Sequence, residues 1–521
     1  MFYRTRKEWD THFRYDSRMD PDPDPAHDSF NLQESRRERG VRRARSHRNE
    51  IIGAVIALVL VAAIGSGVYF LVIRGGSTPS VSSSSTSLAP NSSTTTSSDD
   101  ATTTESSTSS TVANLTPQRL QIDTNPETAK LTMALQDGTT VAGSTPFSKE
   151  VSGGHIKIEL SKAGFNTATR ELTLDRPTDL KIWLDPQGQV LQSVVRFKTG
   201  PGPQQVAFSP DGRELWVALL HGAGLEVYGS TSGTETGEVS LGGKGAAELI
   251  FTGDGATIYA TQIATNLVYE VDRVSRTVKR QLETGGKSPK VLTLSADEKT
   301  LWTANWGSND VSEIDLATGK VVRRLPTVAK PHGLYLTPDG ARLYVAGFEK
   351  GELQRIDLST GAGKVIFTTS GALWDLVADQ TQHLLYVDDS KGNAVYVVDL
   401  ENETATKLAD TDQRPNTMSL SSDGQVLYVS NRGKEDPQNA SHAGPEWGSV
   451  LAIDTTDGTI LDAIVGGNQC TGLDVSSDGS MLAFSDFLDD HVRLYSVPDY
   501  STLVAGNGGR AAQRLKDVVK H

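Results

Sequence analysis

The sequence predicts an all-β fold in which one four-stranded unit is repeated seven times. Short runs that alternate apolar and polar residues are separated by turn-forming residues, and the 521 residues include 49 Gly and 21 Pro. A recurring phrase of the type VAFSPDGRELWVA marks each copy from about residue 200 onward. One additional strand, QVLQSVVRF at 189–197, precedes the first copy, whereas the last copy lacks its fourth strand.

Each copy places a turn, usually acidic, between its first and second strands. The turn positions lie 42 or 43 residues apart, except for a last interval of 55 residues. They are Asp211, Asp254, Asp297, Asp339, Thr381, Asp423 and Asp478. Periods of about 40–45 residues with four strands each are typical of β-propeller blades. We therefore predict a seven-bladed β-propeller over 187–500, closed by the N-terminal strand at 189–197, which completes the last blade.

The repeated region resembles the YVTN family of seven-bladed propellers, which overlaps the lactonase-type propellers. The stretch LWTANWGSNDVSEIDLATGKVVRRLPTVAKPHGLYLTPDGARLYVA (301–346) carries the resemblance, with support from VLYVSNR and VLAIDTTDGTILDAIVGGN. The likeness covers about residues 189–497 and is weakest in the first, fifth and seventh copies. It implies a propeller, and the lactonase-type members make hydrolysis a rival expectation to binding.

Residues 115–186 predict a second, smaller β-domain. Runs such as LQIDTNP, AKLTMAL and HIKIEL alternate with period two and are separated by QDG, GSTP and SGG. The segment resembles a PEGA domain through NPETA (125–129), DG (137–138), GSTP (143–146), SGGHIKIEL (152–160) and AGF (163–165). It departs from that family at Thr128, where Gly is usual, and at Phe165, where Tyr is common. The resemblance implies a small β-sandwich-like surface module with a spacer or adhesive role.

Residues 51–73, IIGAVIALVLVAAIGSGVYFLVI, predict a transmembrane helix. They contain no charged residue and are long enough to span a bilayer. A cleaved signal peptide is the alternative, but about 50 residues precede the segment, and it is longer than a usual signal core. The Arg-rich run at 36–48 places the N-terminus in the cytoplasm by the positive-inside rule. We therefore expect a single-pass protein of the cell membrane with extracellular C-terminal domains.

The segments on either side of that helix lack the apolar residues of a folded core. Residues 1–50 are predicted to be a disordered basic cytoplasmic segment. Residues 74–114 predict an extended stalk, because 25 of the 35 positions in 77–111 are Ser or Thr. The first 50 residues carry a net charge of +2 and the rest −16, which together give the −14 of the whole chain. An acidic exported part argues against nucleic acid as a partner.

Alignment of the seven copies predicts which side chains meet at one end of the ring. In a propeller, the first strand of each blade lines the central channel. The loops that precede this strand share one face, here called the mouth, with the loops that follow the second strand. The residues predicted to bind a ligand there are Lys290, Asn305, Trp306, His332, Phe348, Trp374, Asp389, Asn431, Arg432, Asp486 and Phe487. Aromatic faces beside amide and charged groups suit sugars or extended peptides. As an alternative, the Asn residues cap turns and the Trp and Phe residues pack against the next blade.

The sequence lacks several common catalytic motifs. It has no P-loop, no G-x-S-x-G and no H-E-x-x-H, and its single Cys470 leaves no Cys-based zinc site. We predict no metal site and no cofactor. The hydrolase hypothesis requires the fold to bring His332, as a base or metal ligand, to Asp389, Asp486 or His491.

The sixth copy carries a longer loop at the predicted mouth, RGKEDPQNASHAGPEWGS at 432–449. Long loops on a rigid scaffold often provide specificity, whereas the alternative is a disordered insertion. Residues 501–521 are predicted to be a C-terminal tail without an assigned role. The sequence as a whole predicts a membrane-anchored cell-surface protein whose propeller mouth binds a glycan, peptide or protein partner at the cell envelope. A lactonase-like or other hydrolytic enzyme and a purely structural surface spacer are the alternatives.

Overall fold

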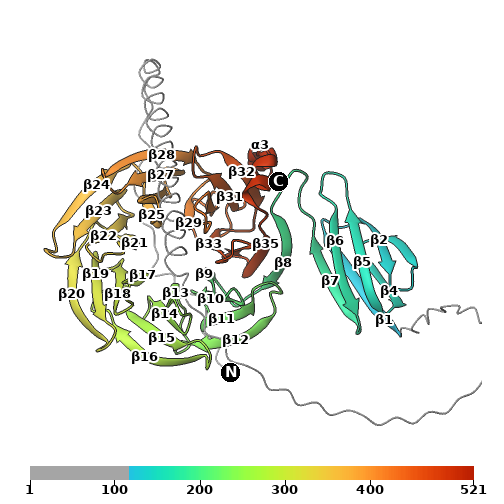
Figure 1. Cartoon of the computed structure of the whole chain (residues 1–521), viewed down its shortest axis with the longest axis horizontal. Helices are drawn as coiled ribbons and strands as arrows, with labels where there is room; N and C mark the ends of the chain where they lie inside the picture. Colours follow the sequence, from blue (N-terminus) through green and yellow to red (C-terminus); the bar gives the residue numbers. More distant parts are fainter. Residues whose placement is uncertain (1–115, 521) are drawn as a thin grey trace, which may run out of the picture. The chain divides into compact units, whose positions relative to one another are not determined.

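The computed structural model describes residues 116–520, which form a small two-sheet domain and a ring of seven four-stranded sheets (Figure 1). The predicted cytoplasmic segment, transmembrane helix and stalk lie outside these residues. Within 116–520, no helix is both long enough and apolar enough to cross a membrane.

The small domain consists of two sheets that share one core. One sheet has the strand order β4–β1–β7 and the other the order β3–β2–β5–β6. The strands are β1 (Pro117–Asn125), β2 (Lys130–Leu135), β3 (Thr140–Ser144), β4 (Phe147–Ser152), β5 (Gly154–Ser161), β6 (Ala168–Leu174) and β7 (Thr178–Trp183). Leu120 and Ile122 of β1 pack with Ile156 and Ile158 of β5 in a single apolar cluster. Because side chains alternate along a strand, the period-two pattern of this segment produces the shared core.

The seven remaining sheets, here called blades 1 to 7, contain the repeated units. Blade 1 contains β9 (Pro203–Phe208), β10 (Glu214–Leu219), β11 (Gly224–Gly229) and β12 (Glu235–Ser240); blade 2 contains β13 (Glu248–Phe251), β14 (Thr257–Gln262), β15 (Leu267–Asp272) and β16 (Thr277–Glu283). Blade 3 contains β17 (Pro289–Leu294), β18 (Thr300–Asn305), β19 (Asp310–Asp315) and β20 (Lys320–Pro326); blade 4 contains β21 (Pro331–Leu336), β22 (Arg342–Gly347), β23 (Glu352–Asp357) and β24 (Gly363–Thr368). Blade 5 contains β25 (Leu373–Asp379), β26 (Leu384–Asp389), β27 (Ala394–Asp399) and β28 (Thr404–Asp410); blade 6 contains β29 (Pro415–Leu420), β30 (Val426–Asn431), β31 (Ser449–Asp454) and β32 (Ile460–Val465). Blade 7 contains β33 (Cys470–Val475), β34 (Met481–Asp486), β35 (His491–Ser496) and, from the N-terminal side of the repeats, β8 (Gln192–Lys198).

The blades form a complete ring. The innermost strand of each blade contacts the innermost strand of the next, and β33 of blade 7 contacts β9 of blade 1 (Figure 1). The outermost strand β8 pairs antiparallel with β35, with Val195 opposite Leu494, which is the place that the sequence predicted for it. The chain therefore has a propeller-like, all-β fold.

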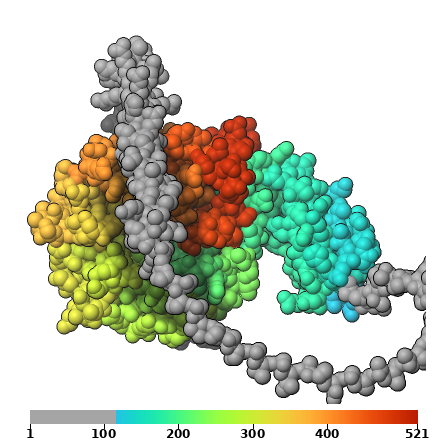
Figure 2. All heavy atoms as spheres, in the orientation of Figure 1, coloured from blue at the N-terminus to red at the C-terminus, as the bar shows by residue number. Residues whose placement is uncertain are grey.

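Apolar side chains fill the space between neighbouring blades. Trp216 of blade 1 packs in one cluster with Ile258 of blade 2, and Tyr428 of blade 6 packs in another with Phe484 of blade 7. Along the part of the rim that is visible in Figure 2, adjacent blades are in contact. The core is thus divided among the blade interfaces, and each second strand contributes to it through fully buried residues.

The turn between the first two strands of a blade is held by a carboxylate. In blade 7, Asp478 accepts hydrogen bonds from Ser476 Oγ at 2.6 Å and from the Ser480 amide at 3.0 Å. In blade 5, where Thr381 occupies the turn position, the carboxylate of Asp379 accepts hydrogen bonds from the amides of Thr381 and Gln382. The turn of the divergent blade is therefore kept by a carboxylate two residues earlier.

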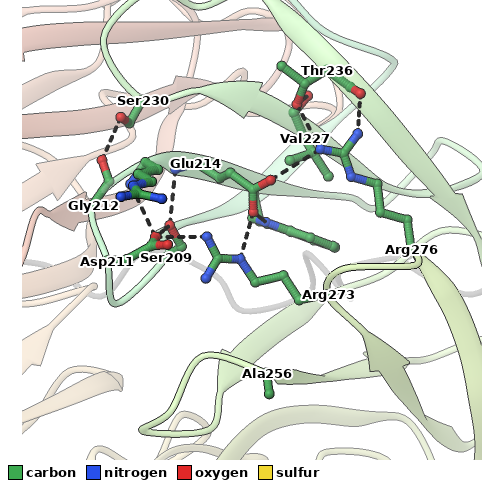
Figure 3. Close-up of polar contacts among 12 residues, drawn as sticks. Ser209, Asp211, Gly212, Glu214, Val227, Ser230, Thr236, Ala256, Arg273 and Arg276 are labelled. Carbon is green, nitrogen blue, oxygen red and sulfur yellow. Dashed lines mark hydrogen bonds and ion pairs between the residues drawn. The ribbon is translucent and has the colours of Figure 1, made fainter.

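Ion pairs connect blades 1 and 2 at the end of the ring that carries these turns, here called the turn face (Figure 3). Arg273, just after β15, donates to Asp211 Oδ1 and to Glu214 Oε2 of blade 1, both at 2.7 Å. Arg276 donates to Glu214 Oε1 at 3.1 Å, and the Trp216 indole donates to Glu214 Oε2, also at 3.1 Å. Both carboxylates therefore have cationic partners at this blade interface.

Two short helices follow blade 7. The first, α2 (Tyr500–Ala505), begins at Asp499, whose carboxylate accepts a hydrogen bond from the Thr502 amide at 2.8 Å. The second, α3 (Gly509–Asp517), packs against β32 of blade 6, and its buried Arg514 pairs with Asp412 at 3.1 Å. Most of the segment that the sequence left as a tail is therefore part of the folded ring.

Candidate functional site

A β-bulge at the start of the innermost strand positions three of the predicted mouth residues. The pairing of the first two strands shifts between Pro289 and Leu292 in blade 3, Pro331 and Leu334 in blade 4, and Leu373 and Leu376 in blade 5. Lys290, His332 and Trp374 lie within these irregularities. A bulge bends its strand locally and changes the direction of the side chains it contains. The fold thereby turns these three side chains out of the regular alternation of the strand.

A repeated backbone hydrogen bond positions the residue that follows the second strand. Its amide donates to the carbonyl of the residue that precedes the first strand of the same blade. The pairs are Trp306 with Ser288 at 3.0 Å, Phe348 with Lys330 at 3.0 Å, Arg432 with Arg414 at 2.9 Å, and Phe487 with Gln469 at 2.9 Å. The four acceptor residues all have a positive φ, between 54° and 61°. One local geometry therefore presents a Trp, a Phe, an Arg and a second Phe at the equivalent position of these four blades.

A side chain of one blade also binds the backbone of the next blade at the mouth. The acceptor is an Asn or Asp that lies in the loop after the second strand and itself has a positive φ. The pairs are Asn266 with the Ser288 amide at 2.7 Å, Asn309 with Lys330 at 2.9 Å, Asn393 with Arg414 at 2.9 Å, and Asp490 with Gly202 at 2.9 Å. The last pair joins blade 7 to blade 1. The mouth is therefore held together across several blade interfaces.

Aromatic rings from blades 3, 4 and 5 form one cluster at the mouth. The ring centroid of Trp306 lies 5.2 Å from that of Phe348 and 5.9 Å from that of Trp374. Phe348 and Trp374 are 5.3 Å apart. All three rings belong to partly exposed residues, so the cluster presents aromatic surface to the solvent.

The ammonium group of Lys290 lies against both indoles. Its Nζ is 4.1 Å from the centroid of Trp306 and 4.8 Å from that of Trp374, within the range of cation–π attraction. Burial lowers the pKa of Lys290 to about 7, and the positive charges of Arg432 and Lys330 act in the same direction. Glu248 is the one charge that opposes this shift among the residues that the structure describes. Lys290 is therefore held by aromatic faces rather than by a carboxylate.

His332 is packed against the same cluster. Its ring stacks on Trp374 at a centroid distance of 3.8 Å, and its side chain is 8% exposed. The Nδ1 atom lies 3.1 Å from the carbonyl oxygen of Trp374, so this nitrogen carries the proton as a hydrogen-bond donor. Burial and the charge of Lys290 hold the pKa of His332 well below its usual value. The imidazole is therefore neutral at physiological pH.

The groups that the hydrolase hypothesis places beside His332 are engaged elsewhere. Asp389 Oδ1 accepts hydrogen bonds from amides of its own blade, Ala372 at 2.7 Å and Gly392 at 2.8 Å. Asp486 is fully buried and forms an ion pair with Arg493 at 2.7 Å. His491 Nδ1 lies 2.5 Å from the carbonyl oxygen of Asp489. Across 116–520, no three His, Cys, Asp or Glu side chains form a group that could hold a metal ion.

The two predicted Asn residues face the interior. Asn305 is fully buried, and its Nδ2 donates to Asp310 Oδ1 at 2.7 Å and to Ser312 Oγ at 2.8 Å. Asn431 is also fully buried, and its Nδ2 donates to the carbonyl oxygen of Val429 at 3.2 Å. The contacts of Asn305 join the second strand of its blade to the third, whereas Asn431 bonds within its own strand. Neither Oδ1 atom has a hydrogen-bond partner among the described residues, so neither side chain caps a turn in the way that the alternative expected.

Blades 6 and 7 contribute a second group at the mouth. The guanidinium carbon of Arg432 lies 6.0 Å from the ring of Phe487, and Arg432 Nη2 donates to Gln469 Oε1 at 2.5 Å. Phe487 is buried, and its ring centroid is 5.3 Å from that of His221. Arg432 and Phe487 are therefore packed and partnered, in contrast to the cluster around Lys290.

The long loop of blade 6 is ordered and bound to the C-terminal tail. The Trp447 amide donates to the Val518 carbonyl at 2.7 Å, and the Lys520 ammonium lies 4.4 Å from the ring of Trp447. Glu435 of this loop forms ion pairs with Arg414 and with Arg432, each at 3.2 Å. A single carboxylate of the loop thus pairs with two arginines near the mouth and offsets one of their two positive charges.

Sequence reasoning missed several charged groups near the site. Burial raises the pKa of Glu248 and Asp388 well above the usual value and that of Asp375 to about 6. Asp388 is fully buried, and one of its oxygens lacks a hydrogen-bond partner among the described residues. Lys330, whose Nζ lies 5.8 Å from the Trp306 centroid, was missed as well. Glu248 and Asp375 could have been noticed in the sequence, because each is an acidic residue within a predicted innermost strand.

A separate cavity lies at the turn face, between the first hairpins of blades 5 and 6. It has a volume of about 470 Å³ and is lined by residues that include Asp379, Gln382, Ser421 and Asp423. None of the predicted site residues contributes to it. The candidate site is therefore the open, aromatic surface at the mouth.

The ring of four-stranded blades with an aromatic and cationic mouth defines a propeller-like repeat protein. No protein-family model matches the chain. Over 356 residues the chain is 33% identical to antigen Lp49 of Leptospira interrogans, an alignment that covers 65% of this chain and 77% of that protein. The chain belongs to the family of antigen Lp49.

Two further similarities are more distant. The ciliary WD repeat-containing protein ctxp80 of Euplotoides octocarinatus is 29% identical over 184 residues, which are 30% of this chain and 23% of that protein. The chain thus matches less than a quarter of the length of ctxp80. Among solved structures, hydrazine synthase of Kuenenia stuttgartiensis aligns with a TM-score of 0.49 and 20% identity, over 58% of this chain and 97% of that chain.

Proposed function

We propose that this protein is a membrane-anchored cell-surface protein whose mouth binds a glycan, peptide or protein partner at the cell envelope. The observation that carries the proposal is the cluster of Trp306, Phe348 and Trp374, partly exposed beside Lys290. Exposed aromatic surface on a rigid scaffold is typical of interaction sites, because a ligand removes it from water. Hydrogen-bonded loops hold this surface in place before any ligand arrives.

The remaining parts of the chain fit this proposal. Residues 51–73 act as the membrane anchor, and the Ser/Thr-rich stalk holds the folded part away from the membrane. The small domain acts as a PEGA-like spacer, and the blades are YVTN-like repeats.

Binding is favoured over hydrolysis by the state of the candidate catalytic groups. His332 is stacked and hydrogen-bonded, Asp389 holds backbone amides, and Asp486 neutralises Arg493. A general base needs a free position near its substrate. The polar groups at the mouth therefore support recognition better than proton transfer.

Glycan and peptide arrays with the full-length protein test the proposal. The Trp306→Ala/Trp374→Ala double variant is expected to bind its array ligand at least ten-fold more weakly than the wild type. The matched control is Phe367→Ala/Tyr396→Ala, which removes an aromatic pair 5.0 Å apart on the outer strands β24 and β27, outside the cluster of Trp306, Phe348 and Trp374. Thermal melting of each variant separates lost binding from unfolding. Absence of any ligand on both arrays would leave the spacer alternative in place.

A further inference from the structure

Two lysines at the mouth face the same indole ring. The ammonium of Lys290 lies 4.1 Å from the Trp306 centroid and that of Lys330 lies 5.8 Å from it. Neither ammonium forms an ion pair with a carboxylate within residues 116–520. Glu435, by contrast, pairs with both Arg414 and Arg432. The loop thus gives the arginines of the mouth a carboxylate partner, whereas neither lysine has a carboxylate within ion-pair distance among the described residues.

This arrangement is costly for the free protein. Lys330 and Arg432 both repel the charge on Lys290, and burial of the ammonium adds to the cost. The chain as a whole has a net charge of −14, so this group of cations is a local exception. An anionic group that contacts both ammonium groups would remove the repulsion and pair the two charges.

The aromatic surface narrows the chemistry of that anion. A small inorganic anion would pair with the lysines but leave Trp306 and Trp374 uncovered. A neutral sugar would stack its C–H face on an indole but leave both ammonium groups unpaired. A sugar ring that carries a carboxylate uses both features. We propose that the mouth binds acidic glycans, with the carboxylate of a uronic-acid unit between Lys290 and Lys330 and its ring on Trp306. This inference rests on the proposed binding function and specifies its ligand.

An extended acidic peptide fits the mouth less well. Peptides that bind along a protein surface commonly exchange backbone hydrogen bonds with it. The mouth amides near the cluster are already used, because Trp306 and Phe348 donate to carbonyls of their own blades. The Lys330 amide donates to Asn309 at 2.9 Å. Side-chain contacts to ring faces and to a carboxylate therefore remain as the main means of recognition.

The charge state of Lys290 makes the expected binding pH-dependent. The groups that face its ammonium are Glu248 on β13, Lys330 before β21, Arg432 after β30 and the neutral His332. With a pKa of about 7, Lys290 is mostly charged at pH 6 and mostly neutral at pH 8. A carboxylate binds the charged form, so affinity should fall about ten-fold between pH 6 and pH 8. The pKa of His332 lies well below its usual value, so His332 does not produce this change.

Titration calorimetry with the full-length protein at pH 6 tests the inference. The probes are a hyaluronan oligosaccharide and the same oligosaccharide with its carboxylates reduced to alcohols, while an oligogalacturonate reports which uronic acid is preferred. We expect the acidic probe to bind at least ten-fold more tightly than its reduced counterpart. Lys290→Met should lose this difference, and Lys290→Arg should keep the binding with a weaker dependence on pH, because Glu248, whose pKa is raised, still faces this group. Lys299→Met, which removes an exposed lysine at the turn face, is the matched control and should bind like the wild type.

The outcomes separate this inference from the proposed function. Equal binding of the acidic and reduced probes, or tighter binding of a poly-glutamate peptide, overturns the acidic-glycan inference. If a neutral glycan or a peptide then binds in a manner that depends on Trp306 and Trp374, the proposed function stands. If no glycan or peptide binds, the acidic-glycan inference is overturned and the proposed function is restricted to a protein partner.

Discussion

The two ends of the ring use the same types of charged residue in opposite ways. At the turn face, a hydrogen bond from Arg273 lowers the pKa of Asp211 to about 2, and one from Ser295 does the same for Asp297. Toward the mouth, burial raises the pKa of Asp375 to about 6 and lowers that of Lys290 to about 7. The carboxylates of the turns are stabilised as ions, whereas the groups near the mouth are destabilised as ions.

This difference indicates that the charged groups of the turn face stabilise the fold, whereas those near the mouth could be stabilised by a ligand. A turn whose carboxylate is fully hydrogen-bonded lowers the free energy of the folded state, and that carboxylate gains little from a ligand. A partly buried ion without a partner raises that free energy, and a ligand can recover the difference. Perturbed charged groups near an exposed surface are therefore candidates for function.

The largest effect on stability is expected at Asp486. This residue was predicted to lie at the mouth, but its carboxylate has a cationic partner, as that of Asp211 does at the turn face. Asp486 is fully buried and pairs with Arg493, so Asp486→Ala leaves a buried guanidinium without its partner. We expect the free energy of unfolding to fall by about 3–5 kcal/mol, measured by chemical denaturation. The exposed Asp457→Ala serves as the control. A loss below about 1 kcal/mol for Asp486→Ala would show that this carboxylate is not structural.

The next effect concerns pH. Asp375 and Asp474 each have a folded-state pKa of about 6, above the value of 3.8 for an unperturbed Asp. The folded state therefore holds more protons than the unfolded state between about pH 4 and pH 6. The free energy of unfolding should rise as the pH falls through this window, by on the order of 2 kcal/mol for each carboxyl.

The turn carboxylates change the free energy of unfolding in the opposite direction. Their pKa values are lowered in the folded state, so the stability that they contribute is lost as the pH falls below about 4. Stability should therefore be greatest near pH 4–5. Denaturation curves from pH 3 to pH 8 measure this profile. The Asp375→Asn/Asp474→Asn variant should reduce the slope above pH 4, while Glu248 and Asp388, whose pKa values are also raised, keep part of it. An unchanged slope would contradict the assignment.

A smaller effect is expected at the turn face. Asp211→Ala removes the hydrogen bond to Ser209 Oγ at 2.6 Å and the ion pair with Arg273, so it should lower the free energy of unfolding by about 1–2 kcal/mol. Asp478→Ala, which lacks an interblade ion pair, should cost about 1 kcal/mol. Thr381→Ala, at the same position of blade 5, should be nearly neutral because Asp379 holds that turn. Ligand binding at the mouth should not change in any of them.

A similarly small effect on stability is expected for Lys330→Gly. Lys330 has a φ of 56°, a conformation that Gly adopts without strain, and Gly202 occupies the equivalent position of blade 1. The substitution should change the free energy of unfolding by less than about 1 kcal/mol, because relief of strain and greater freedom of the unfolded chain oppose each other. Binding of an acidic probe should nevertheless weaken several-fold. If Lys330→Gly instead caused a large loss of stability with unchanged binding, Lys330 would have a structural role and not the binding role assigned to it.

The sequence predicted the repeated part of the structure well because each blade repeats the same local chemistry. The period, the turn carboxylates and the strand that pairs with β35 could all be read from spacing. The sequence also suggested which columns approach the mouth. It did not show that Asn305 and Asn431 point inward, because the direction of a side chain at a loop depends on hydrogen bonds made after folding.

The contacts between blades were also beyond the sequence. The caging of Lys290 joins residues of blades 3 and 5, and the pairing of Glu435 with two arginines depends on the course of the long loop. Neither contact leaves a periodic signal. The same holds for Glu248 and Asp375, whose interaction acts between different innermost strands.

The pairing of β8 with β35 has a mechanical consequence. Any force that reaches the ring from its N-terminal side acts first on the start of β8, the outermost strand of blade 7. Just ahead of that strand, the buried carboxylate of Asp462 accepts hydrogen bonds from the amides of Val190 and Leu191, both at 2.8 Å. Asp462 belongs to blade 6, so a load would be shared by two blades before the β8–β35 ladder is strained. Under tension, Asp462→Ala should therefore let the ring open at a lower force, with little change in the geometry of the mouth.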